Sequence, residues 1–159
     1  LDVINKRPVL LAQASVRPNL SALPKGYEDA EFTSLIPLIA IIKEGLIIRY
    51  RIKANATKRP KSGPMEGKRI ALGADDTKLW WTERALDAGL LLVDEPTLVS
   101  DTLIGALPEK NRLTLRPWQI DGVASIADDT KLTATLQAGI GRGRAYGCGM
   151  LSVAVLRTR

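Results

Sequence analysis

The stretch that decides the fold is LIIRYRIKANATK, Leu46–Lys58. Apolar and polar side chains alternate along it, and this period of two is typical of a strand with one buried face. The expected buried face carries Ile48, Tyr50, Ile52 and Ala54, and the opposite face carries Arg49, Arg51, Lys53 and Asn55. The stretch therefore predicts a half-buried strand whose exposed face is cationic over several residues.

The residues after this strand predict an alternation of helices and strands. The stretch ADDTKLWWTERALDAG is expected to form a helix that Asp75 or Asp76 caps and Gly89 ends. A second helix, over Thr130–Ala138, would be capped by Asp128 or Asp129. Strands are expected at residues 90–93, at 119–126 and in GMLSVAVL, 149–156. The order from Leu46 onward is β-α-β-β-α-β, which is the ferredoxin-like pattern of an α+β domain.

The first of these helices has an expected inner face. Leu79, Glu83 and Leu86 fall close together on the helical wheel with Trp80 beside them, which predicts that Trp80 packs in the core. The adjacent Trp81 points about 100° away. It is therefore expected to be exposed or to lie at a partner surface, where it could stack on a base, as could Trp118.

The residues before Leu46 give a weaker pattern. The stretch VLLAQAS, Val9–Ser15, predicts a short strand, and a proline-containing loop follows it. The apolar segment Leu35–Lys43 leaves a short helix and a buried strand as alternatives. No apolar run reaches the roughly 18–20 residues of a membrane-spanning helix. The chain begins with Leu1 and has no methionine before Met65, so we expect it to be a piece of a longer protein.

The composition removes several kinds of chemistry. The chain contains no histidine, the commonest general base near neutral pH and the commonest metal ligand. Its one cysteine, Cys148, allows no internal disulfide and no multi-cysteine metal site, and we expect that thiol to be buried and inert. The single cysteine is compatible with a reducing, cytoplasmic setting. We expect no cofactor and no metal, and we interpret Asp128 and Asp129 as helix-capping residues.

The positive charge is concentrated in one segment. The formal net charge is +6, yet residues 49–69 alone sum to +7, because eight basic residues are opposed there only by Glu66. These basic residues are Arg49, Arg51, Lys53, Lys58, Arg59, Lys61, Lys68 and Arg69. The second half of the segment, KRPKSGPMEGKRIAL, is expected to form a long hairpin loop. Such a local excess favours nucleic-acid binding, and the alternative is a solvated cationic face without a partner.

A glycine-rich loop, GIGRGRAYGCG, precedes the last strand. It matches neither the dinucleotide fingerprint nor the P-loop, and both of those need a strand before the loop and a helix after it. We expect Gly141 and Gly143 to let the backbone approach a phosphate, with Arg142 and Arg144 adding charge-assisted contacts. The alternative is a tight helix-to-strand connection in which glycine supplies positive φ, and we assign Gly139 that role.

Several stretches together resemble the CasE family, the CRISPR RNA endoribonucleases of Cascade-type effector complexes. The glycine motif GIGRGRAYGCGMLSVA, the basic strand RYRIKANATK, the strand QIDGVASIAD and the earlier VLLAQAS each resemble a family segment, in the same order. Departures are Lys53 for the usual arginine, Ala56 for the usual proline, and Ile120 where phenylalanine is common. The resemblance covers nearly the whole chain.

This resemblance implies a function in antiviral defence. The family cleaves CRISPR repeat RNA beside a hairpin without a metal, leaves a 2′,3′-cyclic phosphate, and keeps the product within a Cascade complex. It also implies two ferredoxin-like domains. Residues 1–43 would then be the remnant of the first domain with a linker, and residues 44–159 the second. The family's catalytic histidine would lie upstream of Leu1, so no catalytic residue is assigned here.

Two other interpretations of the same residues stay open. One is a non-catalytic RNA-binding module with a ferredoxin-like fold. The other is an interaction subunit whose basic loop meets an acidic protein surface. If the chain is a CasE-type protein, its expected partners are the repeat hairpin and other Cascade subunits, with no membrane. Tyr146 could donate a hydrogen bond to RNA or anchor the glycine loop.

Overall fold

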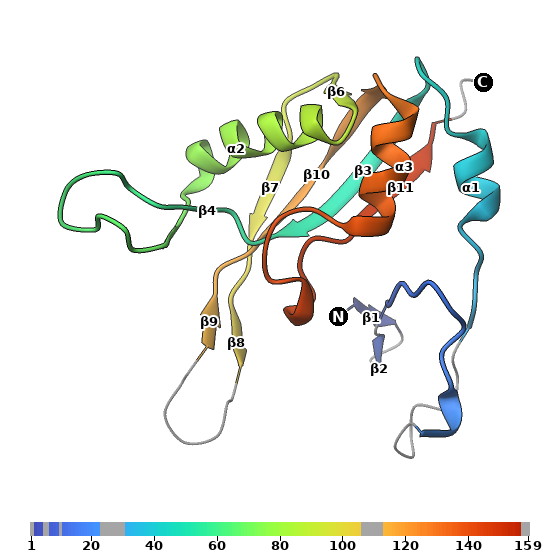
Figure 1. Ribbon diagram of the computed structural model, residues 1–159, viewed down its shortest axis with the longest axis horizontal. Helices are drawn as coiled ribbons and strands as arrows, with labels where there is room; N and C mark the ends of the chain where they lie inside the picture. Colours follow the sequence, from blue (N-terminus) through green and yellow to red (C-terminus); the bar gives the residue numbers. More distant parts are fainter. Residues whose placement is uncertain (1, 5–6, 10, 23–30, 106–112, 157–159) are drawn as a thin grey trace. The chain divides into compact units, whose positions relative to one another are not determined.

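The computed structural model describes residues 2–4, 7–9, 11–22, 31–105 and 113–156, and its contacts divide the chain into two units, residues 1–41 and 42–159. The first unit contains a two-stranded antiparallel hairpin, a short 3-10 turn and one helix (Figure 1). These elements are β1 (Asp2–Ile4), β2 (Arg7–Val9), η1 (Leu20–Ala22) and α1 (Ile36–Ile41). The apolar segment before Gly45 is therefore a helix, the first of its two predicted alternatives.

The strand expected over Val9–Ser15 is wrong at residues 11–15, and residue 10 lies outside the described residues. Strand β2 ends at Val9, and residues 11–15 form no strand and have exposed side chains. An apolar run becomes a strand only when a neighbouring strand pairs with it and a surface covers it. In the described part of the first unit, β2 pairs with β1 alone.

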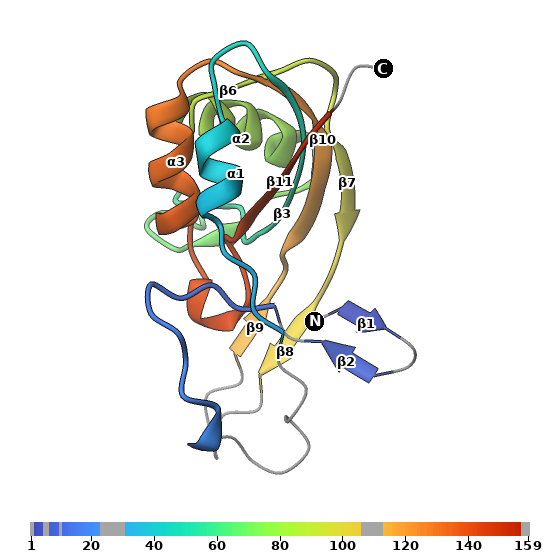
Figure 2. The ribbon, with the colours of Figure 1, turned by 90° about the vertical axis from the view of Figure 1, so that its right-hand side faces the viewer.

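The second unit is built on an antiparallel sheet in the order β11-β3-β10, with β6 and β7 both paired to the far side of β10. Its main strands are β3 (Ile47–Ala54), β6 (Leu90–Leu92), β7 (Thr97–Ser100), β10 (Trp118–Ile126) and β11 (Leu151–Val155). Helices α2 (Ala74–Asp87) and α3 (Asp129–Ala138) lie on the same side of this sheet (Figure 2). This is the ferredoxin-like α+β arrangement, as predicted from the order of elements.

The alternation that predicted β3 is confirmed by burial. Its residues alternate between exposed or half-buried and fully buried positions along the whole strand. The buried members are Ile48, Tyr50, Ile52 and Ala54, each at most 3% exposed. Arg49 and Arg51 are exposed on the opposite face. The cationic face of the sheet is therefore the face that the helices leave open.

The inner face of α2 differs from the predicted one. Trp81 is fully buried, together with Thr77 and Ala85, whereas Leu79 and Leu86 are 69% and 61% exposed. Positions 77, 81 and 85 form a stripe with a spacing of four, which places one large ring between smaller residues against the sheet. The buried indole also contacts the Tyr50 ring, with 5.3 Å between the ring centroids and a tilt of 42°, which is a favourable aromatic contact.

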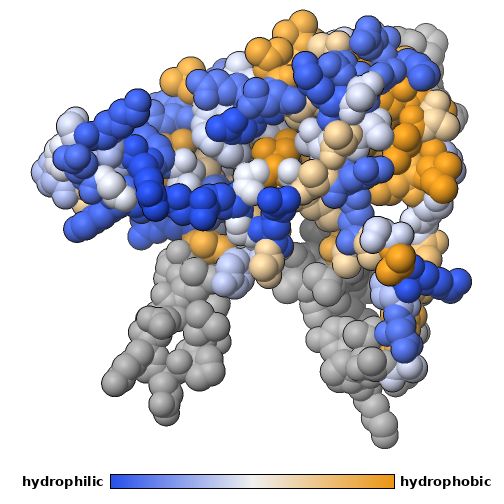
Figure 3. Space-filling view, in the orientation of Figure 1, coloured by the Kyte–Doolittle hydropathy of each residue, from blue (hydrophilic) through white to orange (hydrophobic). Residues whose placement is uncertain are grey.

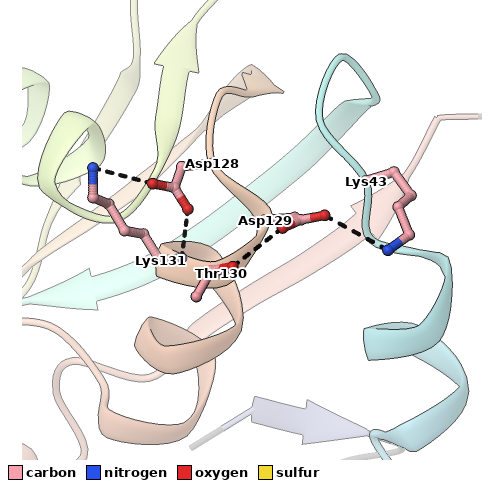
Figure 4. A network of polar contacts seen from close by, with 5 residues as sticks. All are labelled: Lys43, Asp128, Asp129, Thr130 and Lys131. Carbon is pink, nitrogen blue, oxygen red and sulfur yellow. Dashed lines mark hydrogen bonds and ion pairs between the residues drawn. The ribbon is translucent and has the colours of Figure 1, made fainter.

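The predicted N-cap is confirmed for α3 and is wrong for α2. The carboxylate of Asp128 caps α3, because its Oδ1 accepts a hydrogen bond from the Lys131 backbone N–H at 2.8 Å (Figure 4). Neither Asp75 nor Asp76 caps α2, whose N-cap is Gly73 with no side-chain bond. Those two carboxylates lie in the first turn, where the helix dipole favours negative charge. The predicted end of α2 at Gly89 is confirmed.

A glycine in the central strand makes room for a tyrosine. Gly122 of β10 lies directly opposite Tyr50 of β3 in the antiparallel register. A Cβ atom at position 122 would collide with the Tyr50 hydroxyl oxygen. The Asp-Gly pair inside this strand therefore marks no turn. Its glycine lets the Tyr50 ring lie directly against the backbone of the neighbouring strand.

Two hairpins extend from the sheet. The predicted basic hairpin is confirmed: β4 (Thr57–Lys58) pairs with β5 (Ile70–Ala71), and the loop between them projects from the sheet (Figure 1). The loop side chains from Lys61 to Arg69 are exposed, and the projection has a largely hydrophilic surface (Figure 3). A second hairpin, β8 (Leu103–Gly105) with β9 (Leu113–Leu115), was not predicted, because its strands are only three residues long.

The connection from α3 to β11 is closed by its own backbone. Ile140 and Gly149 bond across it, with the Ile140 N–H donating to the Gly149 carbonyl at 2.8 Å. The Gly149 N–H in turn donates to the Lys53 carbonyl at 2.7 Å, which ties the loop to the end of β3. Gly149 has φ +88° and leaves no space for a side chain, because a Cβ would lie 2.5 Å from the Ile140 oxygen.

None of the helices in the described residues is both long enough and apolar enough to span a membrane.

The contact across the sheet gives a stability prediction. Gly122→Ala should lower the free energy of unfolding by about 1–3 kcal/mol, the usual cost of overpacking a close contact, because its Cβ would collide with the Tyr50 ring. Urea denaturation measures the change. Gly73→Ala is the control, since Gly73 has φ −72° and no atom within 4 Å of its Cβ position. Equal losses in the two variants would contradict the steric explanation.

The glycine loop gives a second stability prediction. Gly149→Ala and Gly147→Ala both place alanine at a left-handed φ, +88° and +77°, which costs each variant about 1–2 kcal/mol. Only Gly149→Ala adds the collision with the Ile140 carbonyl, because nothing lies within 4 Å of the Cβ position at Gly147. Gly149→Ala should therefore unfold at a clearly lower urea concentration. A Gly147→Ala variant that is as unstable would refute this account of the loop.

Candidate nucleic-acid interface

The cations of β3 are largely matched by carboxylates from neighbouring strands and loops. Arg51 lies opposite Asp121 of β10 in the register, and its Nε donates to Asp121 Oδ1 at 2.5 Å. The second oxygen of Asp121 accepts from Gln119 Nε2 at 2.8 Å. Lys53 pairs with Asp101, and the hydrogen bond from Lys53 lowers the pKa of that carboxyl below its usual value. These pairs reduce the positive field on the open sheet face.

Arg49 differs from its two neighbours on β3. Its side chain is exposed, and no ion pair to it occurs among the described residues. The residue opposite it on β10 is Val123, which carries no charge. Of the three predicted strand cations, Arg49 is therefore the one whose charge faces the solvent without a carboxylate beside it.

The loop of the basic hairpin carries unmatched charge. Its first strand ends at Lys58, whose Nζ pairs with Asp76 Oδ2 at 2.6 Å. Beyond that point the cations are Arg59, Lys61, Lys68 and Arg69, all exposed and without an ion pair in the part of the chain that the structure describes. Among the described residues, the hairpin loop therefore carries a concentration of uncompensated positive charge, as its composition predicts.

The hairpin loop and the glycine loop meet at their arginines. The pKa of Arg69 is lowered below its ordinary value, first by partial desolvation and then by the positive charges of Arg142 and Arg59. Arg142 follows α3, whereas Arg59 and Arg69 lie at the two ends of the hairpin loop. The two segments approach each other where the hairpin begins, because a Cβ at Gly143 would lie 3.6 Å from Asn55 Cβ and Thr57 lines the same groove as Arg142. We call Arg59, Arg69 and Arg142 the arginine cluster. Like charges held together without a counter-charge form a site for an anion.

Arg144 is turned toward the protein. Its Nη1 donates to the Ala138 carbonyl at the end of α3, at 2.5 Å. Its aliphatic stem packs over the two glycines that close the loop, with Cγ 3.1 Å from a Cβ position at Gly149 and Cδ 3.4 Å from one at Gly139. The guanidinium thus satisfies a free carbonyl at a helix C-terminus, a site that favours a cation. Both arginines are exposed, and they differ in that Arg144 is held to the Ala138 carbonyl.

The two other predicted loop residues have different surroundings. Gly143 has φ +82°, and a Cβ there would lie 3.4 Å from Cys148 Cβ, so the glycine fits against a buried side chain. Cys148 is 3% exposed, and burial raises the pKa of its thiol, which agrees with the expected inert state. Gly141 is exposed and lies beside the ring of Trp80.

The aromatic residues are placed differently from the prediction. Trp80, expected in the core, is only partly buried, and Trp81, expected outside, is fully buried. The Nε1 of Trp118 donates to the Leu72 carbonyl at 3.1 Å, which anchors that ring beside the hairpin. Tyr146 is 50% exposed. Trp80, Trp118 and Tyr146 therefore each reach solvent, Trp80 and Trp118 being partly buried.

Asp128 and Asp129, which we interpreted as capping residues, make structural contacts. Asp128 caps α3 and pairs with Lys131 at 3.1 Å, while Asp129 pairs with Lys43 at 3.7 Å (Figure 4). Within the described ranges, no three His, Cys, Asp or Glu side chains come together in a way that could hold a metal ion. The site as described offers guanidinium and ammonium groups for a polyanion, and no histidine for proton transfer.

Comparison with known proteins agrees with this description. A protein-family model described as CRISPR associated protein matches residues 1–155. The CRISPR-associated endoribonuclease Cse3 of Thermus thermophilus is 33% identical, over 92% of this chain and 73% of that protein.

Solved structures show the same relationship. The structure of the CRISPR endoribonuclease Cse3 bound to a 19 nt RNA superimposes with a TM-score of 0.70 at 27% identity, covering 88% of this chain and 70% of that one. A chain of a CRISPR RNA-guided surveillance complex in a pre-nicking state matches with a TM-score of 0.62 at 32% identity, covering 82% and 63%. The chain belongs to the CasE family of CRISPR-associated proteins.

Proposed function

We propose that this chain functions in the processing of CRISPR repeat RNA, as the part of an endoribonuclease that holds the repeat hairpin. The observation that carries this proposal is the row of exposed cations on the hairpin loop beside Arg142 of the glycine loop, where no ion pair to a carboxylate occurs among the described residues. Its relatives support the assignment, since Cse3 is a CRISPR-associated endoribonuclease and has been solved with bound RNA.

The basic hairpin matches the shape of a folded RNA. A-form RNA has a deep, narrow major groove lined by phosphates, which side chains on a broad surface reach poorly. A two-stranded ribbon with a projecting cationic loop reaches the groove rim, so Lys61, Lys68 and Arg69 contact phosphates there. Arg142 then contacts the same backbone from the glycine loop, while Gly141 and Gly143 keep that loop close to the RNA.

The strand cations make a smaller contribution. Arg51 and Lys53 would have to exchange Asp121 and Asp101 for a phosphate, and an exposed ion pair of this kind is worth only about 0–1 kcal/mol. A phosphate that replaces the carboxylate therefore gains little net free energy. Arg49 and Lys58 contribute through long-range attraction, and Arg144 acts by holding the glycine loop in place.

The cleavage chemistry needs proton-transfer groups as well as cations. Attack of a ribose 2′-OH on the adjacent phosphate requires a base, an acid for the leaving 5′-oxygen, and cations near the developing charge. The chain supplies the cations and contains no histidine. We infer that the catalytic histidine comes from another segment or subunit, that no metal takes part, and that the product bears a 2′,3′-cyclic phosphate. The cleaved hairpin then stays bound within a Cascade complex.

One observation favours a second candidate function. Because no histidine is present, the same surface fits a non-catalytic module that binds RNA hairpins. The two functions share the arginine cluster and differ only in whether the complete assembly cuts the RNA.

The arginine cluster gives an affinity prediction. Replacing Arg69 and Arg142 together by alanine should weaken binding to a repeat hairpin and lower the slope of log K against log salt by about 0.9 for each phosphate that is no longer neutralised. A salt titration by fluorescence anisotropy measures both quantities. Lys131→Ala is the matched control, because Lys131 lies on α3 and pairs with Asp128 away from the cluster. An unchanged salt slope in the double variant would contradict the proposed role.

The missing histidine gives a cleavage prediction. The 159-residue chain should bind repeat hairpin RNA and leave it intact in the presence of a metal chelator, because it contains no histidine to act as a general base. Adding the histidine-bearing segment or subunit should then produce a 2′,3′-cyclic phosphate, detected by phosphatase resistance of the product. Cleavage by the chain alone would place the general base among its own lysines, tyrosines or carboxylates.

A further inference from the structure

A groove of about 520 Å³ lies between α2, α3 and the glycine loop, in the range of roughly 300–1,000 Å³ that small ligands occupy. One wall is α2 with Trp80 and Arg84, the other is α3 with Ala134 and Ala138, and Gly141 and Arg142 close one end. The groove is on the helical side of the sheet. It is therefore separate from the face that carries Arg49 and Arg51.

The indole of Trp80 is the aromatic surface of this groove. Its side chain is partly exposed, and its Cζ2 lies 3.5 Å from the Cβ position of Gly141, so the ring borders the glycine loop directly. The residues across from it are small, since α3 presents Ala134 and Ala138 to the groove. A flat ring facing alanines and glycine leaves space for a second flat ring to stack.

The polar residues of the groove suit a nucleotide. Arg142 lines the groove and also belongs to the arginine cluster. Its positive charge can therefore attract an anion in the groove or at the cluster. Arg84 pairs with Asp87 at 2.7 Å, which leaves Arg142 as the groove cation that has no ion pair among the described residues. Asn55 and Thr135 supply side-chain donors and acceptors near the aromatic wall, of the kind that recognise base edges.

We propose that this groove binds one unpaired nucleotide, with its base stacked on Trp80 and its phosphate at Arg142. Base stacking on an aromatic side chain is a common way to hold unpaired RNA. The nucleotide belongs to a strand that continues from the hairpin, because Arg142 connects the groove to the hairpin-binding surface. This last step rests on the proposed function, whereas the stacking site itself does not.

The test compares two RNAs on the same protein variants. One is a blunt repeat hairpin, and the other is the same hairpin with a short single-stranded extension on its 5′ or 3′ side. Trp80→Ala should weaken binding of one extended hairpin roughly tenfold or more, the usual loss when a stacking ring is removed, and leave the blunt hairpin unchanged. Ala134→Leu, which fills the groove and keeps the indole, should reproduce the effect. Leu79→Ala, a change of a 69% exposed neighbour on α2, should not.

The outcomes separate this proposal from the proposed function. Equal affinity of wild type and Trp80→Ala for both extended hairpins would overturn the groove site. The groove site would also be overturned if Trp80→Ala bound the blunt hairpin more weakly than the wild type. The Trp80 ring would then contribute to binding of the hairpin itself.

A fluorescence experiment tests the groove even if the protein binds no hairpin. Single-stranded RNA should quench tryptophan emission of the wild type, and Trp80→Ala should abolish that quenching. Absence of quenching would refute the site. Adenosine monophosphate is the competitor: if it displaces the strand at equal concentration, the groove takes free nucleotides and the assignment to the RNA strand is wrong.

Discussion

The antiparallel pairing of β3 with β10 is the constraint on which the second unit depends. Eight residue pairs, from Trp118 opposite Ala54 to Ser125 opposite Ile47, fix the register. A shift by one residue would turn Ile48, Tyr50 and Ile52 to the open face and the arginines toward the helices. Gly122 supports the register because a residue with a side chain at that position would collide with Tyr50. The apolar core and the cationic face thus follow from one alignment.

The same strand also places the two loops of the interface. The basic hairpin begins three residues after β3 ends, and the glycine loop is bonded through the Gly149 N–H to the carbonyl of Lys53 near that end. Both loops are therefore anchored to one end of one strand. Repulsion among Arg59, Arg69 and Arg142 opposes this arrangement, and the backbone bonds of the sheet and the loop hold the groups in place against it.

The sequence predicted the parts of this unit that depend on local patterns. Alternation predicted β3 and β11, aspartate before a helical stretch predicted the cap at Asp128, and the density of lysine and arginine predicted the hairpin loop. The inner face of α2 was not predictable in this way, because two leucines compete with one tryptophan and the outcome depends on the shape of the sheet beneath.

The partners of Arg51 and Lys53 were missed for a related reason. Asp121 and Asp101 are 70 and 48 residues away in the sequence, and only the strand register shows which carboxylate faces which cation. The groove beside Trp80 needed the positions of two helices and a loop together, which no single stretch encodes.

The construction of the glycine loop explains how a glycine-rich segment can bind an anion well. A loop that is flexible before binding loses conformational entropy when it closes on a ligand, and this loss weakens affinity. Here the Ile140–Gly149 bond, the bond to Lys53 and the Arg144 clamp on Ala138 hold the backbone before any ligand arrives. Arg142 is therefore presented from a backbone that is already ordered, and most of the entropy left to lose is in its own side chain. Such an ordered loop favours slow release of a bound ligand, in keeping with the retention of the repeat hairpin that we propose.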